Sequence, residues 1–205
     1  MTLNKLKEIR QWPDKIDIKR ETLYTLAAIV SGLLFGYIAK AMDSISIIGD
    51  IGTDLGVWVF VVSMIAAFSS RPLFAMINTP AFLLSMLASY YIYGQVVLGF
   101  FPRAYFMGWL IMAFISPIGG LIVWFARGEK LISSVCAALP AALLFACGYP
   151  AVYALQPVLV LDLLFGVALL LIFPKTWKGR AIAAGIAVVL GFMIVQLRLI
   201  SYLPW

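Results

Sequence analysis

Apolar residues fill this chain in long runs, separated by charged residues, prolines and glycine turns. Seven runs are expected to form helices, at about 22–41, 55–70, 73–93, 105–126, 132–149, 152–173 and 181–202. A helix needs about 20 mostly apolar residues to cross a bilayer. The second and fifth runs are short, and the turn at Arg71 and Pro72 is tight. The pattern predicts an all-α polytopic membrane bundle of seven transmembrane helices, or six with one re-entrant segment.

The residues before the first run follow a different pattern. Four apolar residues stand at helical spacing among basic ones: Leu3, Leu6, Ile9 and Trp12. This spacing predicts a short amphipathic helix on the inner leaflet. Residues 1–21 also hold six basic and four acidic side chains, so no cleavable signal peptide fits the start. We therefore expect a cytoplasmic basic segment at 1–21 and a single transmembrane domain at 22–205.

Composition excludes a soluble globule, because 64% of the residues are hydrophobic, 12% are charged and the mean hydropathy is +1.05. If the N-terminus is cytoplasmic, twelve of the fifteen basic residues fall on the inner side, and only Lys40, Arg103 and Arg198 fall outside. Basic loops stay in the cytoplasm, so this orientation is predicted, with the C-terminus outside if there are seven spans. The net charge of +6 then reflects topology and anionic lipid, and gives no reason to expect nucleic acid as a partner.

One carboxylate, Asp162, interrupts the sixth apolar run. It lies near mid-membrane, or in the outer half if Pro157 starts the helix. An ionised acid facing lipid there would cost about 2.5 to 3.5 kcal/mol, so Asp162 should face the bundle interior. Three interpretations follow: an ion pair with Arg103 or Arg198, a protonated and hydrogen-bonded carboxyl, or a contact to a ligand or coupling ion. In the last case Asp162 and Arg103 are both candidate ligand-binding residues.

The tyrosines are distributed asymmetrically. Eight of the nine fall toward the outer ends of their spans, whereas the tryptophans are spread over both ends. An interfacial aromatic belt explains part of this pattern. The alternative is an aromatic vestibule that opens outward, with Tyr90, Tyr91 and Tyr153 as candidate ligand-binding residues.

Prolines interrupt three spans near their middles: Pro80, Pro117 and Pro140. Each removes a backbone donor and frees a carbonyl one turn earlier. Thr79 and Ser116 precede two of them and offer hydroxyls to re-satisfy the backbone of a packing kink. Because freed carbonyls also line midplane sites in transporters, Ser116 and Pro117 are further candidates for ligand binding.

Several kinds of chemistry find no support in the residues. The chain has no histidine, no phosphate-binding loop, and two cysteines, Cys136 and Cys147, too far apart along one helix to bridge. Asp50 and Asp54 are four residues apart, but Thr53 or Asp54 is better interpreted as the N-cap of the second span than as part of a metal site. No metal, no cofactor and no catalytic residue is predicted.

Four segments resemble a family of uncharacterised, small, multi-pass bacterial membrane proteins of about 200 residues: LGVWVFV (55–61), GFFPRAYF (99–106), SPIGGLIVWFARG (116–128) and LDLLFGVALLLIFPK (161–175). The resemblance implies a bacterial inner-membrane location and no particular activity. A looser analogy, in size and helix count only, links the chain to the substrate-binding membrane subunits of energy-coupling vitamin transporters. Those subunits usually have six spans.

Three functions are therefore considered. The first is a small-molecule binding or transport component whose aromatic pocket opens outward near Asp162, a combination that suits a cationic, apolar ligand. The second is a non-catalytic membrane subunit of a larger complex, such as an ATP-driven permease. The third is an enzyme that modifies lipid at the outer leaflet, which would rest on Asp162 and Asp50 alone.

Overall fold

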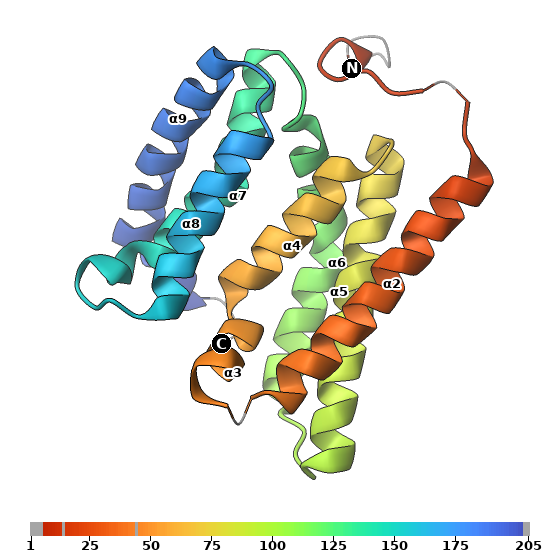
Figure 1. Ribbon diagram of the computed structural model, residues 1–205, viewed down its shortest axis with the longest axis vertical. Coiled ribbons are helices and arrows are strands. Elements are labelled where there is room, and N and C mark those ends of the chain that lie inside the picture. Colours follow the sequence, from red (N-terminus) through yellow and green to blue (C-terminus); the bar gives the residue numbers. More distant parts are fainter. Residues whose placement is uncertain (1–5, 14, 44, 203–205) are drawn as a thin grey trace.

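The computed structural model describes residues 6–13, 15–43 and 45–202. Every regular element in this part of the chain is helical, so the predicted all-α class is confirmed. The elements are α2 (Ile18–Ala41), α3 (Ser46–Thr53), α4 (Leu55–Phe68), α5 (Pro72–Val97), α6 (Arg103–Phe125), α7 (Leu131–Gly148), the 3₁₀ helix η1 (Tyr149–Val152), α8 (Pro157–Ile172), α9 (Trp177–Gln196) and the 3₁₀ helix η2 (Leu199–Tyr202) (Figure 1).

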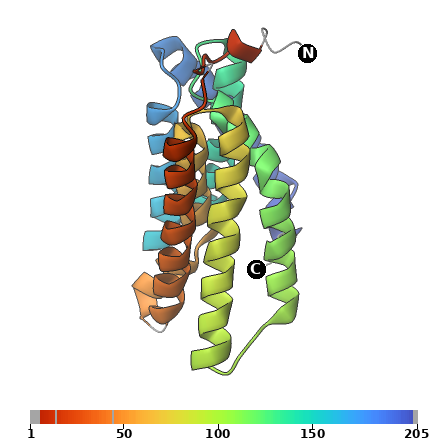
Figure 2. The ribbon, with the colours of Figure 1, turned by 90° about the vertical axis from the view of Figure 1, so that its right-hand side faces the viewer.

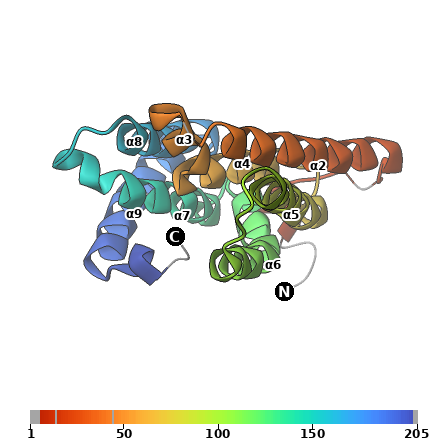
Figure 3. The same cartoon turned by 90° about the horizontal axis from the view of Figure 1, so that it is seen from below.

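The helices form two groups of three, with α4 between them. Helices α2, α5 and α6 make one group and run side by side along the molecule (Figure 2). Helices α7, α8 and α9 make the other group (Figure 3). Helix α4 contributes Val57 and Trp58 to the core of the first group, and Ala66 and Ala67 to the core of the second. The two cores therefore meet at α4.

The two ends of the bundle differ in charge. We call the end where α2, α5, α7 and α9 finish the Lys40 end, and the opposite end the Arg127 end (Figure 1). Basic residues of the loops and helix starts gather at the Arg127 end: Arg20, Arg71, Arg127, Lys130, Lys175, Lys178 and Arg180. At the Lys40 end, the basic residues within the described part of the chain are Lys40, Arg103 and Arg198.

Five helices are long and apolar enough to cross a membrane: α2, α5, α6, α7 with η1, and α9. All seven predicted runs become helices, but α4 has 14 residues and α8 has 16. At about 1.5 Å per residue they reach roughly 21 and 24 Å, less than the hydrocarbon thickness of about 30 Å. The chain is therefore a multi-pass membrane protein with about five long spans, and the count of seven is not confirmed.

Helix α4 begins at Leu55, as predicted, whereas α8 begins five residues later than the predicted run. Residues 152–156, expected to be the first turn of the sixth span, instead end η1 and form a non-helical turn, and α8 starts at Pro157. Helix α4 is preceded by the separate helix α3, which the apolar pattern did not predict. Consequently α5 and α6 extend further toward the Lys40 end than the start of α4 does (Figure 1).

The N-terminal segment packs on the bundle at the Arg127 end. Within its described part only Leu6 and Lys7 are helical, so the amphipathic helix predicted through Trp12 is not continued beyond them. Trp12 packs edge-on against Trp124 at 5.5 Å, and Arg10 donates a hydrogen bond to the Trp124 carbonyl. Burial, together with the charge of Arg127, lowers the pKa of Arg10 to about 10. Arg10 and Trp12 of this segment thus both contact Trp124 at the Arg127 end.

Candidate functional site

A break between α3 and α4 positions the first acid of the candidate site. Asp54 has an extended backbone, with φ −71° and ψ 137°, which ends α3 and begins α4. Its Oδ2 accepts hydrogen bonds from the backbone N–H groups of Gly56 at 2.7 Å and Val57 at 3.2 Å. An acidic side chain in this place satisfies otherwise unpaired N–H groups and suits the positive end of the helix dipole. The prediction of an N-cap at Thr53 or Asp54 is confirmed for Asp54.

Asp162 reaches the same point from α8. Its side chain is 1% exposed and lies against Gly56, where an added Cβ would be 1.8 Å from Asp162 Oδ1 and 2.9 Å from Asp54 Oδ2. The two carboxyls therefore flank one point at the start of α4. Because α8 begins at Pro157, Asp162 is in the second turn of the helix, as expected if Pro157 starts it.

Neither arginine proposed as a partner of Asp162 forms an ion pair with it. The ion pairs among the described residues are Lys40–Asp43, Lys130–Glu8 and Lys175–Glu129. Arg103 and Arg198 are both exposed at the Lys40 end. Both Asp162 oxygens are buried without an N–H or O–H donor among the described residues. The side chain beside Asp162 in the structure is instead a second acid, Asp54, and the two meet where Gly56 lets α4 and α8 approach closely.

An aromatic cavity of about 280 Å³ lies at the Lys40 end, and Thr53, the residue before Asp54, is part of its lining. Its rings come from α4, α5, α6 and the loop between α5 and α6: Trp58, Tyr90, Tyr91, Phe100, Tyr105 and Trp109. Trp58 packs against Trp109 at 5.0 Å and against Tyr90 at 6.3 Å, and Tyr90 packs against Tyr91 at 5.2 Å. Trp58 Nε1 also donates to the carbonyl of Gly52 at 2.9 Å, which ties the cavity wall to the end of α3.

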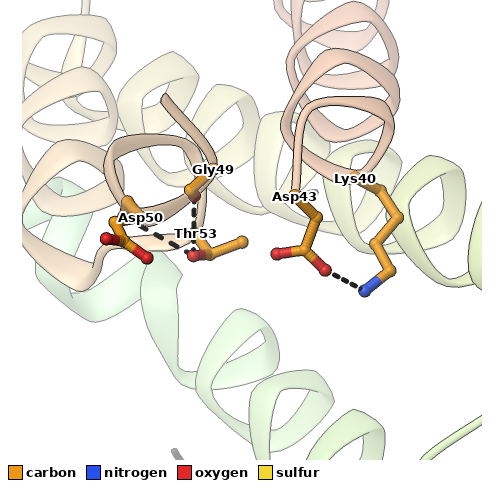
Figure 4. A network of polar contacts seen from close by, with 5 residues as sticks. All are labelled: Lys40, Asp43, Gly49, Asp50 and Thr53. Carbon is orange, nitrogen blue, oxygen red and sulfur yellow. Dashed lines mark hydrogen bonds and ion pairs between the residues drawn. The ribbon is translucent and has the colours of Figure 1, made fainter. Parts of the chain in front are cut away.

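The charged side chain that lines this cavity is a lysine. Lys40 Nζ lies 4.9 Å from the ring centroid of Tyr90 and 2.6 Å from Asp43 Oδ2. Figure 4 shows this ion pair next to the turn of α3 where Thr53 donates to the Gly49 carbonyl. Asp162 lines neither this cavity nor the groove described next. The prediction of a cationic ligand depended on Asp162 lining the pocket, and Asp162 lines neither space.

An apolar groove of about 370 Å³ adjoins the cavity. It is lined by α4, α5, α6 and α7, and Trp58 and Trp109 line both spaces. Exposed residues in the middle of α6 and α7 lie at its edge, among them Ile115, Gly119 and Leu139. The groove therefore opens on the lateral surface of the bundle, where the surrounding side chains are apolar.

Hydroxyl groups in this groove are turned back onto their own helices. Ser116 donates to the carbonyl of Ala113 at 2.7 Å, the carbonyl that Pro117 frees. Thr79 donates to the carbonyl of Ala75 at 2.7 Å. The prediction that these hydroxyls re-satisfy backbone next to mid-helix prolines is confirmed for Ser116, and the groove wall stays apolar as a result.

The structure thus separates residues that the sequence analysis grouped in one pocket. Tyr90 and Tyr91 line the aromatic cavity and Ser116 lines the groove, whereas Pro117 lines neither. Tyr153 is 79% exposed and bonds to Tyr149 at 3.0 Å, away from both spaces. The sequence analysis missed four contributors: Lys40, Asp54, Trp58 and Trp109. In the sequence, Asp54 could have been found from its position in the glycine-containing segment GDIGTDLG, just before an apolar run. Lys40 could have been found as a single basic residue at the end of an apolar run.

Comparison with family models, with curated proteins and with solved structures finds no match for this chain. Neither the family suggested by the four quoted segments nor the analogy to vitamin transporters is therefore shown. Function has to be argued from the site.

Proposed function

We propose that this protein binds or moves an amphipathic, lipid-like molecule, with the apolar chain in the groove and the polar head in the aromatic cavity. One observation carries the proposal: Trp58 and Trp109 line both spaces, so the groove and the cavity meet at these two rings. A ligand entering from the membrane would reach the groove through its lateral opening. Binding sites for small molecules are commonly apolar clefts with a few placed polar groups.

The residues of the cavity indicate the kind of head group. A lysine ammonium has three N–H donors, and Lys40 directs one of them at Asp43. Tyr90 and Tyr105 add hydroxyl groups. Such donors suit a head group with acceptor oxygens, such as a phosphate or a carboxylate. The proposal therefore replaces the cationic ligand with an acidic or neutral, acceptor-rich one.

The proposal includes a membrane arrangement. The seven apolar helices lie in a bacterial inner membrane, with α4 and α8 spanning only part of its thickness. The Arg127 end faces the cytoplasm, and the aromatic cavity opens outward. The distribution of basic residues supports this orientation. Because α4 and α8 are short, their starts lie below the outer membrane surface, which places the carboxyl pair inside the membrane.

Native mass spectrometry of gently extracted protein tests the binding function. The wild type is expected to carry a reproducible added mass of lipid size. In Gly119→Leu the new side chain should fill the groove, since a Cβ at Gly119 meets nothing within 4 Å. We expect its bound fraction to fall at least about tenfold. The matched control is Gly185→Leu on α9, where the space is equally open, and it should bind like the wild type.

The same spectra distinguish the alternatives. In Lys40→Gln, the bound mass should shift away from acidic lipids. A second polypeptide at fixed ratio, lost in Gly119→Leu, would indicate instead a membrane subunit whose groove holds a partner helix. No added mass in the wild type, or equal binding in both glycine variants, would contradict the proposal.

A further inference from the structure

The carboxyl pair of Asp54 and Asp162 has an unusual balance of donors and acceptors. Asp54 accepts two backbone N–H groups at the start of α4. Asp162 is 1% exposed and has no donor among the described residues for either oxygen. Two ionised carboxyls side by side repel each other, and a proton shared between them removes one charge and forms a hydrogen bond.

We propose that Asp54 and Asp162 form a proton-binding site that joins α4 to α8. The proton resides on Asp162, which donates to Asp54. Asp54 is the better acceptor because the N–H groups and the dipole of α4 stabilise its negative charge. This inference does not depend on the proposed lipid ligand.

The helices packed against α8 offer no positive charge that could replace the proton. Helices α4, α7 and α8 contain no lysine or arginine. On α9, Lys178 and Arg180 lie in the first turn, at the Arg127 end. The other titratable group near the pair is the Cys147 thiol on α7. Asp50 on α3 is exposed, and Tyr149 of η1 is paired with Tyr153.

A proton fits the pair better than a metal ion does. Hard cations such as Ca²⁺ or Mg²⁺ need about six or more oxygen ligands. No group of three or more metal-binding side chains (His, Cys, Asp or Glu) is found in the part of the chain that the structure describes. A proton needs only the two facing oxygens.

Occupancy of the site has a mechanical consequence. Helix α4 carries core residues of both helix groups, and α8 belongs to one of them. With the proton bound, the carboxyl hydrogen bond draws α4 and α8 together across Gly56. Without it, two like charges face each other at that contact. The packing of the two helix groups should therefore weaken when the proton leaves.

Infrared spectroscopy of the protein in lipid nanodiscs, with ¹³C-labelled aspartate, tests the site directly. At about pH 6 an ordinary aspartate, with a pKa of about 3.9, is ionised. The wild type should nevertheless show the C=O band of one protonated aspartate, and Asp162→Asn should lose it. Asp50→Asn, an exposed acid four residues before Asp54, is the matched control and should keep the band.

Thermal unfolding across pH gives a second readout. The folded wild type holds a proton that the unfolded chain, with an ordinary aspartate pKa of about 3.9, releases above about pH 4. The unfolding midpoint of the wild type should therefore fall as the pH rises from there. In Asp162→Asn or Asp54→Asn an amide N–H replaces the proton, and asparagine still caps α4. Both variants should lose this decline, and Asp50→Asn should keep it.

Two results would overturn the inference. One is a wild type without the protonated band at about pH 6, or the same band in Asp162→Asn. The other is a midpoint that responds to added Na⁺ or Ca²⁺ and not to pH, which would make the pair a metal site. Because neither readout requires lipid binding, the two proposals fail or survive separately.

Discussion

Most of the polar side chains inside this bundle form hydrogen bonds with one another or with backbone carbonyl groups. Thr25 donates to Asn78 Oδ1 at 2.7 Å, and Asn78 donates to Ser69 Oγ at 3.1 Å. Trp124 Nε1 donates to the Ser69 carbonyl at 2.8 Å. These bonds offset the cost of burying polar groups away from water. Asp162 differs, because the group it faces is another carboxyl and the contact depends on a glycine.

Replacing that glycine tests the contact. In Gly56→Ala the new Cβ would lie 1.8 Å from Asp162 Oδ1 and 2.6 Å from its Cγ, too close without movement of α8. We expect a loss of about 1 to 3 kcal/mol in stability, read from the unfolding midpoint in detergent. Gly185→Ala is the control: its Cβ meets nothing, so the midpoint should hold or rise slightly. Equal midpoints for both variants would show that the helices are not in close contact at Gly56.

Among the elements, the helices around the groove owe their shape to local backbone chemistry. Pro117 removes a donor from the middle of α6, yet the helix continues through it from Arg103 to Phe125. Ser116 makes this continuity less costly by donating to Ala113. Asp54 has the opposite effect, since its extended backbone separates α3 from α4. One proline-containing helix thus stays whole, and a stretch without proline is divided in two.

A double-mutant cycle measures how Ser116 and Pro117 depend on each other. Ser116→Ala alone leaves the Ala113 carbonyl unpaired and should cost about 0.6 kcal/mol or somewhat more in stability. In a Pro117→Ala background the new N–H can bond to that carbonyl, so the same serine change should cost nearly nothing. Reversible unfolding of the four proteins gives the coupling energy. If Ser116→Ala lowered the stability equally with proline and with alanine at position 117, the serine hydrogen bond would not depend on the missing donor of Pro117.

For the molecule as a whole, the bundle is two helix groups packed through α4, with charge concentrated at one end. The N-terminal segment closes the Arg127 end by contacts to Trp124 and to Lys130, which pairs with Glu8 at 2.7 Å. The aromatic cavity and the carboxyl pair both lie toward the other end. Any transported molecule would therefore meet chemically different surfaces at the two ends.

Cysteine labelling in intact cells checks the proposed orientation. The native Cys136 and Cys147 are first replaced by alanine. Arg103→Cys, exposed at the Lys40 end, should react with a membrane-impermeant maleimide in intact cells. Glu129→Cys, exposed at the Arg127 end, should react only after permeabilisation; losing its surface pair with Lys175 costs little. The reverse pattern would place the aromatic cavity on the cytoplasmic side.

The sequence by itself determined the features that depend on neighbouring residues. Lengths of apolar runs fixed the membrane class and the positions of seven helices, since a helix in lipid satisfies its own backbone. The cap at Asp54 and the bond from Ser116 were also predictable, because a cap acts within three residues and a proline frees the carbonyl four residues earlier.

Only the tertiary structure decided which distant residues meet. Charge complementarity suggested Arg103 or Arg198 for Asp162, but the close approach of α4 and α8 at Gly56 brings Asp54 there instead. Likewise, tyrosines that share an end of the bundle separate into Tyr90 and Tyr91 in the cavity and Tyr153 on the surface. A one-dimensional pattern gives the depth of a side chain along its helix. Which neighbour the side chain faces depends on the rotation and packing of the helices. Contacts between residues that are distant in the sequence determine both.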